Sequence, residues 1–220
     1  MGEFLGSFIE QLQRPQWSEA VLRHVELSAL ALLVGMIVSV PLAVAVSRHP
    51  RAALASINVT NLGRAVPDLA LLALALFIIG LGFWSAEAAL ILLSMPPIII
   101  NTVTGLNQVE DKIIDSARGM GLSEWQILTG IQLPIAAPVI FAGIRTSAVQ
   151  VVAGATLATF IGGGGLGVFI VAGFAGFDYP MMLAGALAVA VLAIVTEFTF
   201  GGLERLSTPT GLKVSKKKGT

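Results

Sequence analysis

The chain contains no cysteine, two histidines and one tyrosine, and only 12% of its 220 residues are charged. Without thiols it can form no disulfide, no thiolate metal site and no cysteine nucleophile. His24 and His49 are too few for a histidine-based metal centre, so no metal is expected. The motifs GxxxxGKS/T, HExxH and GxSxG are also missing, which excludes an ATP-phosphate loop and the common intramembrane hydrolase sites. We therefore expect no enzymatic activity and no ATPase site in this chain.

Apolar residues, in contrast, make up 55% of the chain, and its mean hydropathy is +0.88. A soluble domain of this length cannot bury so much apolar surface, so lipid has to be its solvent. A helix needs about 20 residues to cross the hydrocarbon core. Five charge-free stretches have suitable lengths: 27–46, 69–86, 88–109, 146–177 and 179–196. The sequence thus predicts an all-α integral membrane protein with about five transmembrane helices. The glycine run 162–165 divides the fourth stretch into a full crossing and a shorter, re-entrant piece.

Basic residues follow the first, third and last of these stretches, whereas the connections 80–87 and 162–180 contain no Lys or Arg. Because Lys and Arg gather on the cytoplasmic side, this pattern predicts an N-terminus outside and a C-terminus inside. Residues 107–134 then form a cytoplasmic loop, and residues 207–220 form a basic cytoplasmic tail. Residues 1–20 read as an amphipathic N-terminal arm, and residues 1–220 as one transmembrane domain.

Residues 115–134, DSARGMGLSEWQILTGIQLP, are polar and helix-like, although the sequence on both sides is apolar. Apolar side chains over residues 113–122 have helical spacing, and a glycine turn at Gly121 ends this helix. Ser123, with Gln126 three positions later, predicts a capping box that starts a second short helix. Two helices joined by a glycine turn suit the docking of a partner protein. The alternative is an ordinary connecting loop that lies on the lipid surface.

The same segment resembles the EAA loop of binding-protein-dependent ABC importer permeases, whose pattern is Glu-Ala-Ala, three residues, Gly, nine residues and Ile-x-Leu-Pro. Asp115, Ser116 and Ala117 stand in the first three places, Gly121 follows after three residues, and IQLP follows after nine more. DSA in place of EAA keeps the charge and the small size. The residues assigned to this coupling loop are Asp115, Ser116, Ala117, Gly119, Gly121, Ser123, Glu124, Trp125, Ile131, Leu133 and Pro134.

The resemblance implies a type I ABC importer permease fold. It also implies that a short helix over residues 123–130 lies in a groove of a separate ATPase subunit and transmits closure of that subunit to the spans. ATP and Mg²⁺ would be bound by the ATPase, and no cofactor by this chain.

Further segments narrow the resemblance. NLGRAVPDLALLALALFIIGLGFW, SMPPIIINTVTGL, LPIAAPVIFAGIRTSAV, GATLATFIGGGGLG and TPTGL are similar to permeases of osmoprotectant importers, which handle glycine betaine, choline and carnitine. The resemblance implies alternating access in a complex with two ATPases, a second permease subunit, identical or a paralogue, and a separate extracytoplasmic substrate-binding protein. It places the chain in a bacterial or archaeal cytoplasmic membrane, as a multi-pass protein surrounded by lipid and without a nucleic-acid partner.

Two alternatives stay open. In the first alternative, the chain is an ABC permease for another small solute, such as an amino acid or another betaine-like compound. In the second, it is a secondary transporter or a membrane scaffold that uses no ATPase. Secondary transporters usually have duplicated halves, and the sequence contains no internal repeat.

Ionisable groups at membrane depth are costly and are candidates for function. Arg64 and Asp68 flank Pro67, and Arg145 lies within an apolar segment. We expect each of these residues either to line the translocation path or to pair with a group on the same or a neighbouring helix. For Arg64 and Asp68 we favour an ion pair on one face of a helix bent at Pro67, and for Arg145 snorkelling or an interhelical bond.

A glycine-rich segment, GGGGLG, follows the fourth stretch. No strand precedes it, so a dinucleotide site is disfavoured, although its glycines match GxGxxG. We interpret it as a closely packed turn at the outer mouth, formed by Gly162, Gly163, Gly164, Gly165 and Gly167.

Overall fold

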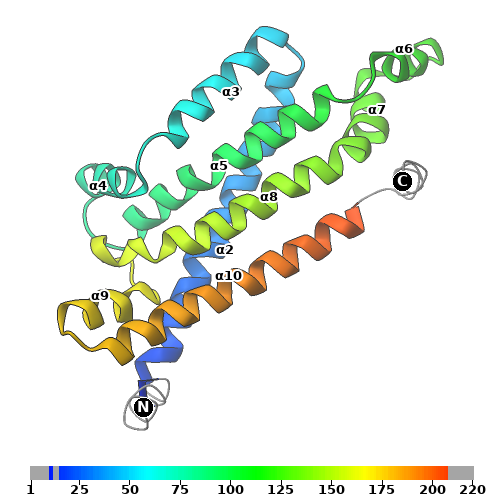
Figure 1. Cartoon of the computed structure of the whole chain (residues 1–220). Helices are drawn as coiled ribbons and strands as arrows, with labels where there is room; N and C mark the ends of the chain where they lie inside the picture. The colour runs from blue at the N-terminus through cyan, green and yellow to red at the C-terminus, as the bar shows by residue number, and fades with distance from the viewer. Residues whose placement is uncertain (1–9, 12–14, 208–220) are drawn as a thin grey trace.

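The computed structural model describes residues 10–11 and 15–207, and every regular element in that part of the chain is a helix. Four long helices form the elongated body of the molecule (Figure 1): α2 (Pro15–Ser47), α5 (Phe83–Asn107), α8 (Leu133–Ala155) and α10 (Tyr179–Ser207). The shorter helices are α3 (Pro50–Arg64), α4 (Asp68–Ile79), α6 (Asp111–Gly119), α7 (Glu124–Ile127) and α9 (Gly167–Ala175).

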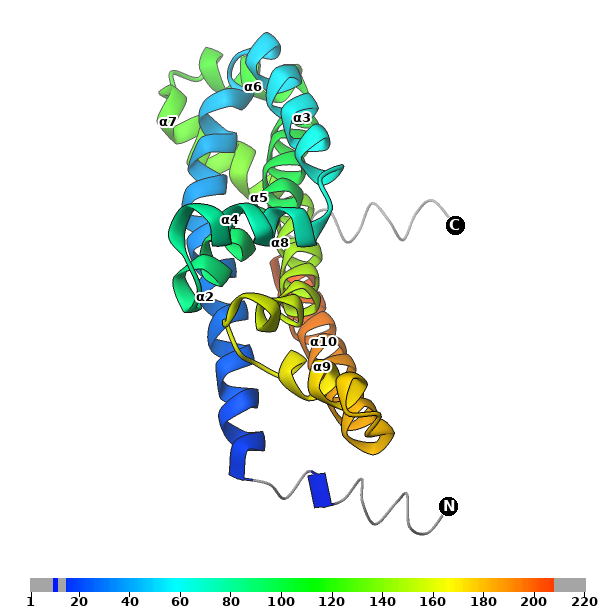
Figure 2. The ribbon, with the colours of Figure 1, turned by 90° about the vertical axis from the view of Figure 1, so that its left-hand side faces the viewer.

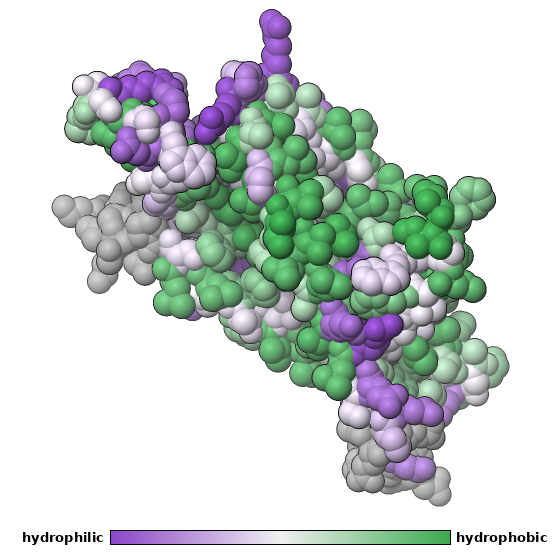
Figure 3. All heavy atoms as spheres, turned by 180° about the vertical axis from the view of Figure 1, so that it is seen from behind, coloured by the Kyte–Doolittle hydropathy of each residue, from purple (hydrophilic) through white to green (hydrophobic). Residues whose placement is uncertain are grey.

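The two ends of this body differ in character. One end carries α6 and α7, residues 111–127, and the end of α10 lies on the same side of the molecule (Figure 1). We call it the loop end. The opposite end, which we call the glycine end, carries the start of α2, the turn 162–165 and α9. Viewed from behind in Figure 3, apolar residues cover the middle, and polar residues gather towards both ends. This distribution suits a protein whose middle faces lipid.

In the described residues, four helical segments are long and apolar enough to cross a membrane, and the pair α3 and α4 makes a fifth crossing if its bent halves count as one. The two halves meet at an angle of 92°, and Figure 2 shows α4 lying crosswise to α2. Counting this pair as one crossing places the beginning of α2 and the end of α10 on opposite sides. The prediction of about five spans is therefore confirmed, with one of them broken.

α5 is the central helix of the bundle. In the most apolar 18-residue stretch of α5, 56% is buried, against 11% in that of α10. The reason is that α5 packs along both α2 and α8, whereas α10 packs mainly on α8 and α9. Small residues bring α5 and α8 close together: a Cβ on Gly143 would lie 2.7 Å from the carbonyl oxygen of Pro97, and a Cβ on Gly105 3.2 Å from that of Ala136. Close helix contact through small residues is the usual way to pack helices in lipid, where water does not drive association.

Two predicted span boundaries are wrong. The sequence placed a boundary at Glu87, between the stretches 69–86 and 88–109. In the structure α4 ends at Ile79 and α5 begins at Phe83. Gly80 and Gly82 have φ values of +98° and +124°, which favour glycine and break the helix there. Glu87 lies inside α5 and is buried, so its charge does not mark a membrane surface.

The fourth crossing begins earlier than predicted. Its charge-free stretch starts at Thr146, but α8 starts at Leu133 and includes Arg145. The helix also ends at Ala155, before the glycine run that was expected to divide it. The apolar piece after the run is α9, whose nine residues span only about 14 Å at 1.5 Å per residue. α9 is too short to cross a bilayer, and this agrees with the prediction of a short piece after the crossing.

The expected ion pair on one helix face between Arg64 and Asp68 is wrong. Arg64 ends α3 and Asp68 begins α4, on opposite sides of the bend at Pro67. A residue before proline avoids the α region, so the chain turns instead of continuing one bent helix. Among the described residues the ion pairs do not include Arg64 with Asp68.

The predicted terminal segments fall mostly outside the described residues. Of the arm over residues 1–20, residues 15–20 belong to α2, and residues 1–9 and 12–14 lie outside the described part. Of the basic tail over residues 207–220, Ser207 ends α10, and residues 208–220 lie outside the described part.

Candidate functional site

The loop end is built around the turn that joins α6 to α7. Asp111 in the first turn of α6 and Arg118 in its last turn complement the helix dipole. The helix ends in a Schellman motif: the Leu122 N–H donates to the Ala117 carbonyl at 3.2 Å, and the Gly121 N–H donates to the Arg118 carbonyl at 2.9 Å. Gly121 has φ +85°, the left-handed conformation that this motif requires. Gly121 thus sets the direction in which the chain leaves α6.

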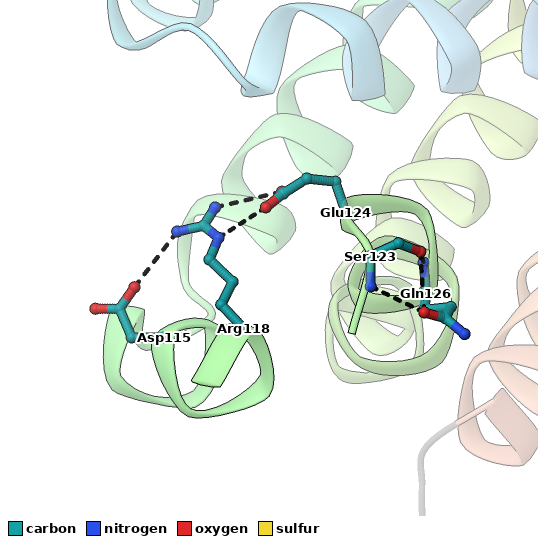
Figure 4. Close-up of polar contacts among 5 residues, drawn as sticks. All are labelled: Asp115, Arg118, Ser123, Glu124 and Gln126. Carbon is teal, nitrogen blue, oxygen red and sulfur yellow. Dashed lines mark hydrogen bonds and ion pairs between the residues drawn. The ribbon is translucent and has the colours of Figure 1, made fainter. Parts of the chain in front are cut away.

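α7 begins with the predicted capping box, which is confirmed (Figure 4). The Gln126 N–H donates to Ser123 Oγ at 3.4 Å, and the Ser123 N–H donates to Gln126 Oε1 at 2.8 Å. These two reciprocal bonds satisfy donors that an uncapped helix would leave free. Their effect is to fix where α7 starts.

Arg118 bridges the two helices across the turn (Figure 4). Its Nε donates to Glu124 Oε1 at 2.7 Å and its Nη2 to Glu124 Oε2 at 3.3 Å, while Nη1 reaches Asp115 at 3.4 Å. The bonds to Glu124 raise the pKa of the Arg118 guanidinium above its ordinary value, so this group remains charged. Because the pair is exposed, it contributes little to stability, but its two-point geometry orients α7 relative to α6. Arg118 was absent from the predicted coupling residues, although its position three residues after Asp115 is a signal that sequence offers.

α7 starts where predicted but does not end before the next crossing. It continues through a π-helical turn, Leu128–Gln132, directly into α8. In this turn the Leu133 N–H donates to the Leu128 carbonyl, five residues back. Pro134 has no N–H, and its ring would clash with the Gly130 carbonyl in a regular helix, so the wider turn accommodates it. Residues 124–155 therefore form one helical segment, and a displacement of α7 is passed on to α8.

The loop presents apolar side chains to its surroundings. Met120, which follows α6, is 72% exposed, and Trp125 in α7 is 68% exposed. Ala117, the small residue of the spaced motif, is 1% exposed, so it packs inward while Asp115 and Ser116 stay on the surface. Large exposed apolar residues rimmed by polar ones mark interaction sites. Ile131 and Leu133 are half-buried, and Pro134 is exposed, where the segment joins the body of the molecule.

A polar cavity of about 460 Å³ separates this loop from the corner between α2 and α3. Arg48 from the corner and Arg118, Asp111 and Glu124 from the loop line it. Arg48 acts electrostatically on Glu124 across this space. The loop is therefore joined to the rest of the bundle chiefly through α8 and the end of α5, with room to move relative to α2.

The glycine turn stands at the other end. Gly162, Gly164 and Gly165 have φ values of +78°, +82° and +86°, and the Gly163 N–H donates to the Ala158 carbonyl at 2.8 Å. A Cβ on Gly167 would lie 2.0 Å from the Thr156 carbonyl oxygen. The turn thus needs glycine, partly for its backbone conformation and partly for close packing.

His24 connects three elements at this end, and sequence reasoning missed it. The Leu166 N–H donates to His24 Nδ1 at 3.2 Å, and His24 Nε2 lies 2.9 Å from the Val152 carbonyl. Since Nδ1 accepts, Nε2 must carry the hydrogen, and the ring is the neutral tautomer. One fully buried side chain therefore ties α2 to the end of α8 and to the glycine turn. Glu87, also missed, lies nearby on α5.

Arg145 joins α8 to α10. Its Nε donates to Glu197 Oε1 at 2.9 Å, its Nη2 also contacts Glu197, and its Nη1 donates to Glu204 Oε2 at 2.9 Å. Gly201 makes room for the guanidinium, since a Cβ there would lie 3.3 Å from Arg145 Cζ. Glu197, Gly201 and Glu204 follow one another at helical spacing on one face of α10. Of the two roles considered for Arg145, this geometry is that of an interhelical bond.

Replacing Arg145 by glutamine is expected to loosen α10 from α8, because the variant loses the guanidinium that bonds Glu197 and Glu204 across the two helices. Thermal unfolding of the purified protein in detergent, followed by tryptophan fluorescence, should show a larger fall in Tm for Arg145→Gln than for Glu197→Gln, which leaves Glu204 as a partner. Reversing the pair, with Arg145→Glu and Glu197→Arg together, should recover part of the loss. Equal Tm values for all variants would contradict this role.

No group of three or more His, Asp or Glu side chains that could hold a metal ion occurs within residues 10–11 and 15–207.

Comparison with known proteins gives a consistent result. Residues 27–207 match the family described as binding-protein-dependent transport system inner membrane component. The chain is 39% identical over 197 residues to the carnitine transport permease protein OpuCB of Listeria monocytogenes, and the match covers 90% of each of the two chains. It is 39% identical over 194 residues to the glycine betaine/carnitine/choline transport system permease protein OpuCB of Bacillus subtilis, with 88% of this chain and 89% of the relative covered.

A third relative, the osmoprotectant import permease protein OsmW of Salmonella typhimurium, is 37% identical over 196 residues, which cover 87% of this chain and 91% of OsmW. Among solved structures, a chain of the MetNI methionine ABC transporter in an inward-facing conformation superposes with a TM-score of 0.76. The match covers 87% of this chain and 96% of that one at 20% identity, so it supports the predicted type I fold alone. The chain is a multi-pass membrane protein and belongs to the family of binding-protein-dependent transport system inner membrane components.

Proposed function

We propose that this chain is the permease subunit of an ATP-driven importer that takes up quaternary ammonium osmoprotectants such as glycine betaine, choline and carnitine by alternating access. It works with two ATPase subunits, which bind ATP and Mg²⁺, with a second permease subunit, identical or a paralogue, and with a separate extracytoplasmic substrate-binding protein. Its place is the cytoplasmic membrane of a bacterium or archaeon.

The coupling role rests on the loop end. An exposed tryptophan and an exposed methionine stand on a rigid helix–turn–helix whose second helix continues into α8. A partner that binds Trp125 and Met120 and then moves would shift α8 along its length, and α8 packs on the central helix α5. ATP-driven closure of an ATPase is a source of such movement. Asp115, Ser116, Gly119 and Ser123 are exposed in the same loop and are assigned to the same docking surface.

The solute class rests on the relatives. Several curated permeases that are 36–39% identical along most of this chain carry names for carnitine, choline, glycine betaine or osmoprotectant transport. On this basis the loop end faces the cytoplasm, and the glycine end faces the outer compartment, where a binding protein would deliver the solute. The exposed apolar surface of α10 then meets lipid or the second permease subunit.

Uptake of labelled glycine betaine into proteoliposomes tests this function. The vesicles contain this chain with its ATPase and binding protein, and unlabelled choline, carnitine and proline serve as competitors. We expect uptake that requires both ATP inside and the binding protein outside, with competition by choline or carnitine. Uptake without ATP would contradict an ABC importer. A complex that hydrolyses ATP but moves none of these solutes would leave the coupling mechanism intact and overturn the solute class.

A further inference from the structure

At the glycine end, the side chain of Arg23 on α2 covers an aromatic ring of α5. Its guanidinium carbon lies 4.1 Å from the centroid of the Phe83 ring. Nη1 donates to Glu26 Oε2 at 2.8 Å, and Nε donates to the Gly163 carbonyl at 3.3 Å. A cation thus already rests on an aromatic face and a carboxylate, in the arrangement by which proteins bind ammonium groups.

A second carboxylate, that of Glu87 on α5, lies within electrostatic range of this cation. Glu87 follows Phe83 by one helical turn, so both face α2. The residue is 1% exposed, and neither carboxylate oxygen has a hydrogen-bond partner among the described residues. Arg23 and Glu26 act electrostatically on Glu87 across the interface of α2 and α5. A buried carboxylate without a partner is costly and calls for an explanation.

The balance of charge suggests what the explanation is. Glu26 pairs with the Arg23 guanidinium and Glu87 lies within electrostatic range of it, whereas the neighbouring His24 is neutral because its Nδ1 accepts a hydrogen bond and its Nε2 faces a carbonyl oxygen. When both carboxylates are ionised, this cluster carries one excess negative charge. A quaternary ammonium group has no N–H to donate, so proteins hold it by opposite charge and by aromatic faces and not by hydrogen bonds from its nitrogen. Trp84, which is 69% exposed, stands edge-on to Phe83 with their ring centroids 5.2 Å apart and adds a second aromatic side chain.

We propose that Phe83, Glu26 and Glu87 form a transient site for the quaternary ammonium group of a solute, and that Arg23 is a tethered cation that occupies this site until a solute displaces it. The proposal rests on the proposed function and adds to it the residues that receive the solute in the permease. Displacement of Arg23 would also break its bond to Gly163 and leave the glycine turn tied to α2 through His24. Arrival of a solute would thereby loosen the contact between α2 and this turn.

Binding of labelled choline to the transporter, assembled with its ATPase but without the binding protein, tests the proposal. The complex is held in nanodiscs of phosphatidylglycerol, which carries no ammonium group. Arg23→Gln removes the competing cation and should tighten binding roughly tenfold. In that background Phe83→Leu should weaken it by roughly fivefold, within the range of cation–π contributions, and Glu87→Gln should weaken it similarly. Phe83→Tyr should restore most of the loss, since it keeps the ring.

Two matched variants control for general effects. Phe77→Leu removes an exposed ring from α4, and Glu19→Gln removes an exposed carboxylate from α2; both should leave choline affinity unchanged. If Arg23→Gln binds choline no better than the unaltered chain, or if Phe83→Leu has no effect in that background, the proposal is overturned. If phosphatidylcholine nanodiscs abolish choline binding, the site holds a lipid headgroup, and its role in solute transfer is overturned.

Uptake into proteoliposomes, measured in parallel, separates this proposal from the proposed function. If the unaltered complex takes up choline but the variants bind it equally, the site is wrong and the importer stands. If no quaternary ammonium solute is taken up at all, the proposed solute class fails, and this proposal fails with it.

Discussion

Replacing Gly143 by leucine is expected to prevent α8 from packing against α5. The Cβ alone would lie 2.5 Å from Asn101 Cβ and 2.7 Å from the Pro97 carbonyl oxygen, and the backbone of a central helix cannot easily retreat. Overpacking of this kind costs roughly 3 kcal/mol, which corresponds to a fall of roughly 6–12 °C in Tm for a chain of this length. Thermal unfolding and size-exclusion chromatography of the purified protein in detergent would measure the effect.

The loss of stability expected for Gly143→Leu comes from the close contact with α5 and not from the loss of a glycine, and a substitution at Gly202 tests this difference. Gly202 lies in α10, and a Cβ there meets nothing within 4 Å. Gly202→Ala should therefore leave Tm unchanged or raise it slightly, because alanine favours the helix by about 1 kcal/mol. Gly143→Ala should lie between the two variants. A Gly143→Leu protein that is as stable as the original would show that α5 and α8 do not meet closely at this point.

Replacing Gly121 by valine is expected to uncouple ATP hydrolysis from transport while the chain still inserts in the membrane. Gly121 has φ +85°, which costs a non-glycine residue roughly 1–2 kcal/mol and costs a β-branched residue more. Relief of this strain would break the Schellman bonds to Ala117 and Arg118 and turn α7 away from α6. We expect ATP-driven uptake to fall by more than an order of magnitude, with weaker co-purification of the ATPase.

Gly121→Asn separates the backbone conformation from the added side chain. Asparagine enters the left-handed region more readily than other residues, and a Cβ on Gly121 meets nothing within 4 Å of this chain. Most of the uptake should therefore survive in Gly121→Asn. If asparagine and valine abolish uptake equally, the loss arises from contact with the ATPase surface and not from the angle between α6 and α7.

The local structure of residues 111–127 could be predicted in detail because it is set by neighbours in sequence. The capping box depends on Ser123 and Gln126, and the turn depends on a glycine after an amphipathic helix, so each interaction spans at most five residues. The number of crossings could also be predicted, since the length of an apolar stretch is a local property. What local signals did not reveal was the continuity of α7 with α8, which runs through a π-helical turn that accommodates Pro134.

Charged residues inside the crossings misled the sequence analysis for one physical reason. Charged residues at membrane depth face the interior of the bundle and usually pair with another group there, and that partner can be anywhere in the chain. Arg145 can lie within α8 because its guanidinium pairs with Glu197 and Glu204, which follow it by 52 and 59 residues. Glu87 lies within α5 although sequence placed a boundary there, and Arg64 and Asp68 are separated by a bend of 92°.

The sequence by itself thus determined that the chain is a helical membrane protein, the number of its crossings and the local structure of residues 111–127, all of which follow from composition and short-range spacing. Tertiary structure alone decided where charges sit in the bundle: Arg23 meets the Phe83 ring 60 positions away, and His24 accepts a bond from Leu166, 142 positions away. These contacts depend on how helices pack, since packing brings together groups whose separation along the chain carries no signal.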